Sequence, residues 1–232
     1  MPDQKLPAAT PSGVDAFLAQ ARRAPLPAVA GRGRLVFALD ATMSRQPTWD
    51  LAQSLQGKMF AAAGRHGGLD VQLLYYRGFS ECRASPFVSQ GQGLAGFMSR
   101  IDCRSGNTQI EKVLRHIRDE AGAMRIGAFV FVGDAVEEQD ERLFALAGEL
   151  GLLGVKGFVF QEGENAAPAR VFREIARLTG GAYAIFDASA PARLASLLSA
   201  AAAYASGGRA ALERQALEDG NAAARLLLAQ MR

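Results

Sequence analysis

The chain has 232 residues, of which 49% are hydrophobic and 21% are charged, and its formal net charge is +3. This composition is typical of a globular protein and argues against a disordered chain or a nucleic-acid-binding surface. No run of about 18 apolar residues occurs, so we expect no membrane-spanning helix. The two cysteines, Cys82 and Cys103, form no CxxC pair and adjoin neither histidine, which argues against a zinc site.

Residues 1–33 form a segment that differs in composition from the rest of the chain. The first 13 residues are rich in proline and small polar residues and contain no apolar stretch of signal-peptide length. We therefore expect a cytoplasmic protein in which the two cysteines are reduced, with a Cys82–Cys103 disulfide as the alternative. A short amphipathic helix is predicted over Val14–Arg23, and the prolines and glycines that follow it predict a linker.

From residue 34 to residue 206, apolar runs of strand length alternate with longer segments of helical pattern. Most of these runs are continuous, which is typical of parallel strands covered on both faces. A further short strand within Glu81–Val88 is expected to form an antiparallel hairpin at the sheet edge, because it closely follows the second strand. The expected strands are Leu35–Leu39, Val71–Tyr76, Phe129–Val132, Val155–Phe160 and Ala182–Phe186.

The helical segments complete the predicted architecture. They are Pro47–Gly64, Gly93–Arg100, Gln109–Ala121, Glu137–Leu150, Ala167–Leu178 and Pro191–Tyr204. The alternation predicts an α/β domain over residues 34–206: a three-layer, Rossmann-like open sheet, mostly parallel with one short antiparallel edge strand, and with helices on both faces. Residues 207–232 contain strong helix formers and predict a C-terminal helical extension, which Gly220–Asn221 breaks in two.

Oxygen-bearing side chains follow three of the predicted elements. Asp40 ends the first strand, and Thr42 and Ser44 follow it at alternate positions. Asp134 follows the central apolar strand, and Thr108 stands in the loop before a predicted helix. Ligands of open α/β sheets bind beyond the carboxyl ends of the strands, so we expect these five residues to converge. Two carboxylates and three hydroxyls favour Mg²⁺, with Mn²⁺ as the alternative.

This pattern resembles the von Willebrand factor type A (VWA) domain, whose metal-ion-dependent adhesion site (MIDAS) has three sequence elements. The first is an Asp with hydroxyls two and four residues on, here Asp40, Thr42 and Ser44 in DATMS. The second is a loop Thr, here Thr108 in SGNTQI, and the third is an Asp after a central strand, here Asp134 in FVFVGDA. The resemblance covers about residues 34–204. It departs at Thr42, where the family usually has Ser; the oxygen is kept and the methyl stiffens the side chain.

The resemblance implies both a ligand set and a type of function. Thr42, Ser44 and Thr108 would ligate the ion through their hydroxyls, while Asp40 and Asp134 would act largely through bound waters. An open coordination position would then take a carboxylate from a partner protein. The implied role is a non-enzymatic adaptor in a cytoplasmic complex, often beside an AAA-type ATPase. The charge and hydropathy patterns predict no nucleic-acid or membrane partner.

Each site residue also has a simpler explanation. Asp40 and Asp134 are of a type that commonly occupies turns and helix caps. Thr108 could cap its helix, with Glu111 at the offset of a capping box. Four acids are expected in the first turn of the following helix, where they would complement its dipole: Glu137, Glu138, Asp140 and Glu141.

Three further residues would surround a metal site: Met43, Arg45 and Arg104. An arginine there would favour an acidic partner, although a solvated surface position is the simpler expectation for each arginine.

The sequence leaves two other function classes open. A Mg²⁺-dependent phosphatase with Asp40 as nucleophile is the enzymatic alternative. Such enzymes carry a second Asp two residues on, where this chain has Thr42. A structural adaptor with an empty site is the remaining class.

Overall fold

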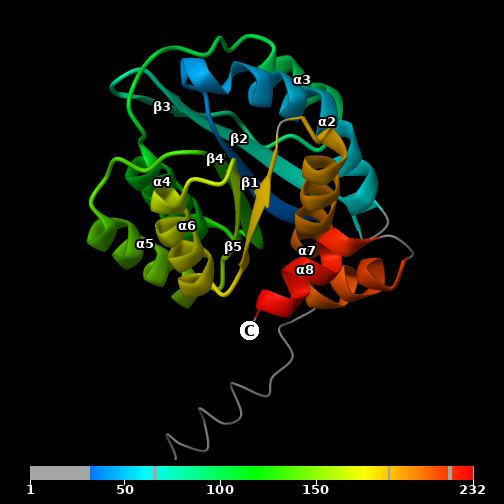
Figure 1. The fold of residues 1–232 in the computed structure, drawn as a ribbon. Coiled ribbons are helices and arrows are strands. Elements are labelled where there is room, and N and C mark those ends of the chain that lie inside the picture. The colour runs from blue at the N-terminus through cyan, green and yellow to red at the C-terminus, as the bar shows by residue number, and fades with distance from the viewer. Residues whose placement is uncertain (1–31, 65–66, 188, 219–220, 232) are drawn as a thin grey trace, which may run out of the picture. The chain divides into compact units, whose positions relative to one another are not determined.

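The computed structural model describes residues 32–64, 67–187, 189–218 and 221–231. The helix predicted over Val14–Arg23 lies outside these ranges. Within them, a six-stranded sheet lies between two groups of helices, as Figure 1 shows. This arrangement is the three-layer α/β architecture that the sequence predicts.

The sheet has the strand order β3-β2-β1-β4-β5-β6, and every neighbouring pair is parallel except β2 with β3. The predicted antiparallel edge strand is therefore confirmed. Successive parallel strands are added on one side of β1 and then on the other, so the direction of winding reverses between β1 and β4. The strands are β1 (Gly33–Asp40), β2 (Leu69–Arg77), β3 (Glu81–Ala84), β4 (Ala128–Gly133), β5 (Lys156–Glu162) and β6 (Ala182–Phe186).

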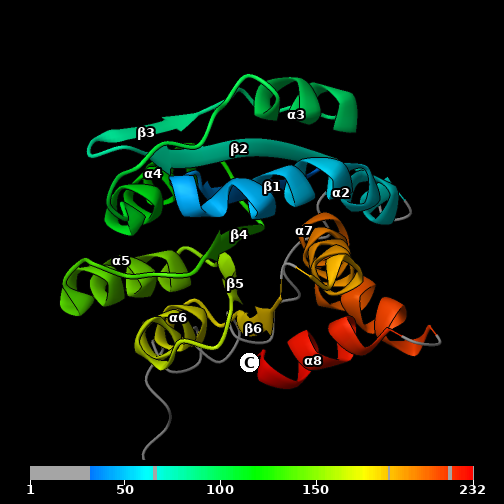
Figure 2. The ribbon, with the colours of Figure 1, turned by 45° about the horizontal axis from the view of Figure 1, so that its top comes forward.

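The helices form a layer on each face of the sheet (Figure 2). One layer contains α2, α3, α7 and α8, and the other contains α4, α5 and α6. None of the described helices is long and apolar enough to cross a membrane. Their bounds are η1 (Met43–Arg45, a 3-10 turn), α2 (Gln46–Gly64), α3 (Gly91–Met98), α4 (Ile110–Ala123), α5 (Asp140–Leu152), α6 (Ala166–Leu178), α7 (Pro191–Leu217) and α8 (Ala222–Gln230).

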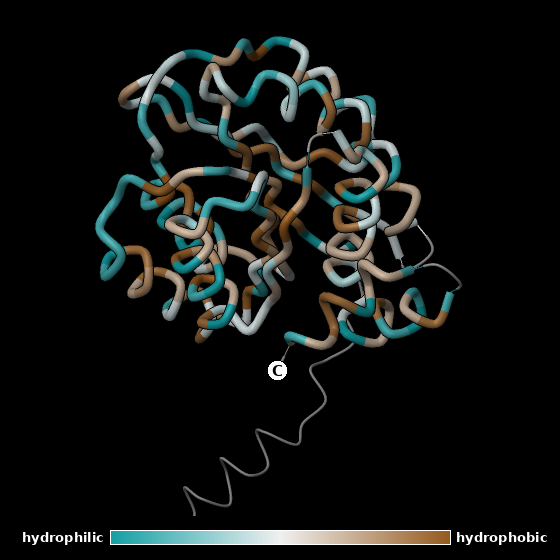
Figure 3. Tube along the Cα trace, viewed as in Figure 1, coloured by the Kyte–Doolittle hydropathy of each residue, from teal (hydrophilic) through white to brown (hydrophobic). Residues whose placement is uncertain are grey.

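The continuous apolar strands supply both cores, because successive side chains of a strand point to opposite faces. In β1, Leu35, Phe37 and Leu39 pack in the core on the α2 and α7 side, whereas Val36 and Ala38 pack in the core on the α4 side. All five are almost completely buried. In Figure 3 the most hydrophobic parts of the trace accordingly run through the centre of the molecule.

Two helix boundaries differ from the prediction by three residues or more. Helix α5 begins at Asp140 and not at Glu137. Helix α7 continues past Tyr204 to Leu217, with a kink at Gly207 and Gly208. Gly208 has φ of 65°, a left-handed conformation that glycine adopts at little cost, so the chain bends there and resumes its helix.

Helix α8 lies beside the edge strand β6 and supplies hydrogen bonds to one of its residues. The Gln230 side-chain amide donates to Tyr183 O at 2.9 Å, and its oxygen accepts from Tyr183 N at 3.0 Å. One side chain thus replaces the two backbone groups that a further strand would supply. Exposed strand edges invite pairing with other chains, and this contact covers part of the β6 edge.

Both cysteines are unpaired thiols, so the structure has no Cys82–Cys103 disulfide. Burial raises the pKa of Cys82 and of Cys103 to about 11. The thiolate is the reactive form, so both side chains are poor nucleophiles at neutral pH and act as packing residues.

Candidate functional site

The sheet brings Asp40 and Asp134 together at the point where its winding reverses. Leu39 of β1 pairs in register with Val132 of β4, so the two aspartates leave adjacent strand ends. A Cβ on Gly133 would lie 3.9 Å from the Cβ of Asp40. In open α/β folds this switch point is where ligands bind.

The backbone just after β1 fixes the Asp40 carboxylate. Asp40 is 4% exposed, and its Oδ1 accepts a hydrogen bond from Thr42 N at 2.7 Å. The same turn directs two hydroxyls toward each other, since Thr42 Oγ1 lies 3.5 Å from Ser44 Oγ. Adjacent ligands of an octahedral Mg²⁺, each about 2.1 Å from the ion, would be about 3 Å apart. The two hydroxyls therefore stand near the spacing that one cation requires.

The loop that carries Thr108 is held against two strand ends. Arg104 N donates to Ala41 O at 3.0 Å, which ties the loop to the residue after Asp40. On its other side, Gly106 packs on the β2–β3 turn so closely that a Cβ there would come within 2.0 Å of Gly78 O. The loop thus places Thr108 at the carboxyl edge of the sheet, where it is 9% exposed.

Thr108 is bound by two acids from the loop after β4. Its hydroxyl donates to Glu138 Oε2 at 2.5 Å and accepts from Glu137 N at 2.9 Å. Its backbone N donates to Glu137 Oε2 at 2.8 Å. A hydroxyl oxygen has two lone pairs, so one acceptor position of Thr108 remains for a cation.

These contacts correct two sequence predictions. Glu137 and Glu138 precede α5 and do not enter its first turn; instead Glu138 accepts hydrogen bonds from the Ile110 and Glu111 amides at the start of α4. The simpler explanation in which Thr108 and Glu111 form a capping box is also wrong, because Gln109 is the N-cap residue and makes no side-chain cap bond. A carboxylate from the neighbouring loop satisfies the helix N-terminus in its place.

The prediction of a solvated surface position was wrong for Arg45. Its side chain is only 11% exposed and forms ion pairs with two strand-end acids, Asp134 at 3.3 Å and Glu162. The Thr48 hydroxyl donates to the same Glu162 carboxylate. Arg104, by contrast, is 58% exposed and pairs with Asp102, as expected for a surface arginine.

The aspartate at the switch point is held in an unfavourable electrostatic setting. Burial raises the pKa of Asp40, the hydrogen bonding of Thr42 and the nearby Tyr76 phenol lower it, and the neighbouring Asp134 raises it further. The Tyr76 phenol is fully buried, and burial followed by the nearby Asp40, Glu138 and Asp134 charges raises its pKa well above the ordinary value. Its hydroxyl nevertheless makes no hydrogen bond of normal geometry among the described residues. A bound cation would stabilise this desolvated, acid-rich edge.

The side chains fit a hard cation by the chemistry of their donors. Within the described residues, no group of three or more His, Cys, Asp or Glu side chains is placed to hold a metal ion. An ion at this edge would therefore depend on hydroxyl oxygens together with the two aspartates. Oxygen donors of this kind suit Mg²⁺ or Mn²⁺.

Sequence reasoning missed three residues of this edge: Tyr76, Glu138 and Glu162. Tyr76 and Glu162 lie at the carboxyl ends of β2 and β5, so the strand pattern itself was the signal for them. Glu138 had no such signal, because its contact with α4 depends on how two loops meet.

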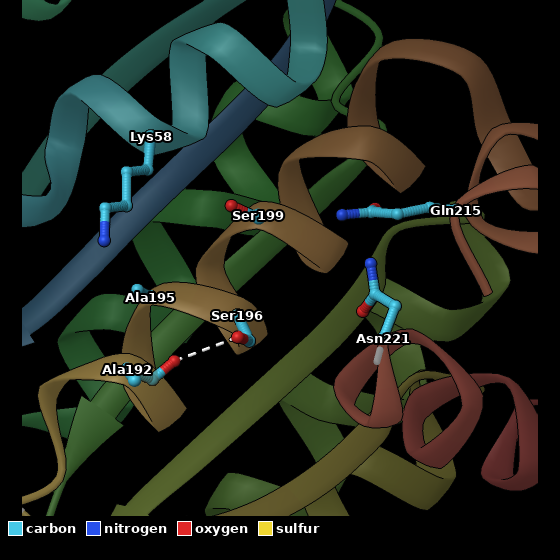
Figure 4. A pocket seen from close by; sticks show the side chains of 7 residues that line it. All are labelled: Lys58, Ala192, Ala195, Ser196, Ser199, Gln215 and Asn221. Atoms are coloured by element: carbon cyan, nitrogen blue, oxygen red, sulfur yellow. Dashed lines mark hydrogen bonds between the residues drawn. The ribbon is translucent and has the colours of Figure 1, made fainter. Parts of the chain in front are cut away.

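A polar cavity of about 300 Å³ lies elsewhere, between α2, α7 and the start of α8 (Figure 4). In it, Ser196 Oγ donates to Ala192 O at 2.9 Å, and Gln215 Oε1 is buried with no hydrogen-bond partner among the described residues. The cavity shares no residue with the carboxyl-edge site. Its lining residues are Lys58, Ala192, Ala195, Ser196, Ser199, Gln215 and Asn221.

Comparisons with known proteins agree on one fold. No family model and no curated protein sequence matches the chain. Among solved structures, it is similar to von Willebrand factor type A from Catenulispora acidiphila, with a TM-score of 0.59, 14% identity, and coverage of 75% of this chain and 43% of that one. The SpRpn10 VWA domain matches with a TM-score of 0.54, 11% identity, and coverage of 70% and 95%.

The chain has the von Willebrand factor type A fold. A further structure with this likeness is proximal thread matrix protein 1 from the mussel byssus, described with a zinc-occupied MIDAS motif, with a TM-score of 0.57, 13% identity, and coverage of 73% and 45%. The chain spans nearly all of the SpRpn10 domain but less than half of the other two proteins. At these identities the likeness establishes the VWA fold alone.

Proposed function

We propose that this VWA domain is a non-enzymatic, metal-dependent protein-interaction module. Asp40, Thr42, Ser44, Thr108 and Asp134 would hold Mg²⁺, with Mn²⁺ as the alternative ion. The cation would then accept a Glu or Asp carboxylate from a partner protein. The main support for this proposal is that the Thr42 and Ser44 hydroxyl oxygens lie 3.5 Å apart beside the buried Asp40 carboxylate. Burial raises the pKa of this carboxyl, so a bound cation would stabilise its charged form.

The surroundings of the site fit a partner that docks on the carboxyl edge. Met43 is 60% exposed on the turn between β1 and α2, and Phe79 is 79% exposed on the β2–β3 turn beside the Thr108 loop. Exposed apolar side chains next to a charged site are common features of protein interfaces. An AAA-type ATPase as the partner class, and a cytoplasmic location, rest on the family resemblance and on the two unpaired thiols.

The enzymatic alternative has weaker support. A phosphatase of the kind considered above would need an acid or base near Asp40, and the residue two positions on is Thr42, whose hydroxyl faces Ser44. Turnover of a generic aryl phosphate by the Mg²⁺-loaded protein would support that alternative instead.

Selection from a random peptide display library tests the proposal directly. The protein is immobilised in excess Mg²⁺, and bound peptides are eluted with chelator. We expect the eluted peptides to share a Glu or Asp and to lose binding to Asp40→Asn. Asp119→Asn, which removes an exposed carboxylate on α4, is the matched control and should bind normally. Peptides that bind equally well in chelator would contradict the proposal.

A further inference from the structure

The Arg45 side chain is largely buried, which is uncommon for an arginine. It follows Ser44 directly in the η1 turn, yet its guanidinium is buried between the ends of β4 and β5. Its Nε is buried with no hydrogen-bond partner among the described residues. An orphaned buried donor costs free energy, so this placement reflects the positive charge of the group and not optimal hydrogen bonding.

That charge stands where the carboxyl edge has an excess of acids. Asp40, Asp134 and Glu162 leave three adjacent parallel strands, and Arg45 contacts two of them. Asp134 is one of the residues assigned to the metal. A guanidinium and a divalent cation that bind one carboxylate repel each other. The ion therefore binds less tightly while Arg45 is paired with Asp134.

We propose that Arg45 is a built-in competitor of the metal: it holds Asp134 when the ion is absent and withdraws to Glu162 when the ion binds. This inference rests on the proposed metal site. Glu162 provides the second position because it already contacts the guanidinium and is fixed by the Thr48 hydroxyl. The arginine therefore keeps a partner in both arrangements, which avoids leaving a buried charge unpaired.

The chain connectivity couples the two events. Ser44 is assigned to the ion and Arg45 is the next residue, so both lie in the same three-residue turn, Met43–Arg45. Movement of Ser44 onto a cation would shift the backbone that carries the guanidinium. Two alternative contacts on one short element make a switch whose populations the metal sets.

The competition predicts opposite effects for the two ends of the ion pair. Arg45→Gln removes the competitor, so Mn²⁺ affinity should rise by about fivefold or more, the usual scale of coupling between linked sites. Glu162→Gln removes the position to which Arg45 withdraws, so Mn²⁺ affinity should fall. A purely structural ion pair would lower affinity, or leave it unchanged, in both variants.

The experiment is a titration of the chelator-stripped protein with Mn²⁺, followed by the electron paramagnetic resonance signal of the free ion. Arg170→Gln is the matched control, because it removes the same charge from an exposed ion pair with Asp140 and should leave affinity unchanged. Asp40→Asn identifies the site and should abolish binding. Circular dichroism confirms that each variant is folded.

A double variant separates competition from simple charge effects. In the Arg45→Gln background, Glu162→Gln should have little further effect, because Glu162 acts through the arginine. An equal loss of affinity in both backgrounds would overturn the proposal. Should Arg45→Gln fail to fold, Glu162→Gln alone still tests it, and an affinity at or above that of the unmodified chain would overturn it.

The outcomes also distinguish this inference from the proposed function. Mn²⁺ binding that Asp40→Asn abolishes, together with unchanged affinity in Arg45→Gln, overturns the role of Arg45 and leaves the metal site standing. Folded proteins that bind no Mn²⁺ in any variant overturn the metal site and the competition together. Tighter binding by Arg45→Gln that still requires Asp40 supports both.

Discussion

The two ends of the sheet are built from different residues. The amino ends of the parallel strands β1, β4, β5 and β6 each have a glycine at or within one residue of the first strand position: Gly33, Gly127, Gly157 and Gly181. The carboxyl ends of the same strands each lead into an acid: Asp40, Asp134, Glu162 and Asp187. The amino ends are therefore small enough for close packing, whereas the carboxyl ends gather acidic side chains.

At the amino end the glycines permit close contacts between backbones. A Cβ on Gly33 would lie 2.1 Å from Ala205 O of α7, and a Cβ on Gly181 would lie 2.0 Å from Gly157 O. At the carboxyl end, carboxylates lie near one another with one buried arginine between two of them. We infer that stability is concentrated at one end and binding at the other.

The largest effect should come from filling an amino-end contact. Gly181→Ala should lower the free energy of unfolding by about 3 kcal/mol, because the added methyl meets a backbone oxygen that cannot move aside. This corresponds to a fall of roughly 6–12 °C in Tm for a domain of this size. Gly148→Ala, inside α5 with nothing within 4 Å of the new Cβ, is the control and should stabilise slightly. Equal Tm changes in the two variants would remove the basis of the comparison.

The contact of α8 with β6 is a second test of the amino end. Gln230→Ala removes both hydrogen bonds to Tyr183 and should cost about 1.5 kcal/mol in urea unfolding. Hydrogen exchange gives the local result, since the Tyr183 amide should lose protection. Gln92→Ala, at an exposed position of α3, should change neither quantity. Unchanged protection of Tyr183 would mean that Gln230 does not cover the edge.

A substitution at the carboxyl end should raise the stability of the protein and not lower it, because the buried Asp40 carboxylate opposes folding when no metal is present. Burial raises the pKa of Asp40 above its ordinary 3.8, so between that value and the raised pKa the folded state binds more protons than the unfolded state. Stability of the metal-free protein therefore falls as pH rises through this window. Asp40→Asn should be more stable by on the order of 1 kcal/mol at pH 7 in chelator, and the gain should vanish below pH 4.

Thermal unfolding across pH in chelator measures this effect. The Asp119→Asn variant, which changes an exposed carboxyl on α4, provides the reference. A loss of stability in Asp40→Asn at pH 7 would show that the carboxylate is structural and would remove the contrast between the two ends.

The smallest effect on stability is expected at the exposed apolar residues beside the site, Met43 and Phe79, which we call the rim. Phe79 is 79% exposed, so Phe79→Ala should change the free energy of unfolding by less than about 0.5 kcal/mol. Binding of the selected acidic peptides should nevertheless weaken by about fivefold or more, the usual threshold for an interface residue that contributes energy. Leu152→Ala, at a 92% exposed position that ends α5, should alter neither stability nor binding. A large loss of stability in Phe79→Ala would contradict a binding role for the rim.

The architecture could be predicted from the sequence because the composition of each strand indicates how deeply the strand is buried. Continuous apolar runs such as the one in β4 identify parallel, doubly covered strands, and glycines and prolines locate most of the connections. The extension of α7 was missed because Gly207 and Gly208 are typical helix-ending residues, and only packing shows that the helix resumes after them.

For the site, the sequence predicted the polar residues that leave each strand but not the contacts among them. The pairing of Arg45 with Glu162 spans 117 positions of sequence, and no local pattern encodes it. The capping of α4 by Glu138 likewise depends on the meeting of two loops. Long-range contacts between charged side chains are set by the tertiary fold, which is why they were missed while the strand-end pattern was found.

Anomalous diffraction from crystals grown with Mn²⁺ would locate the ion and the Arg45 side chain in one structure. We expect an anomalous peak at the carboxyl edge of β1 and β4, in contact with the Thr42 and Ser44 hydroxyls, and Arg45 paired with Glu162 alone. The contradicting result is a protein crystallised at saturating Mn²⁺ with no peak at this edge and with Arg45 still bound to Asp134.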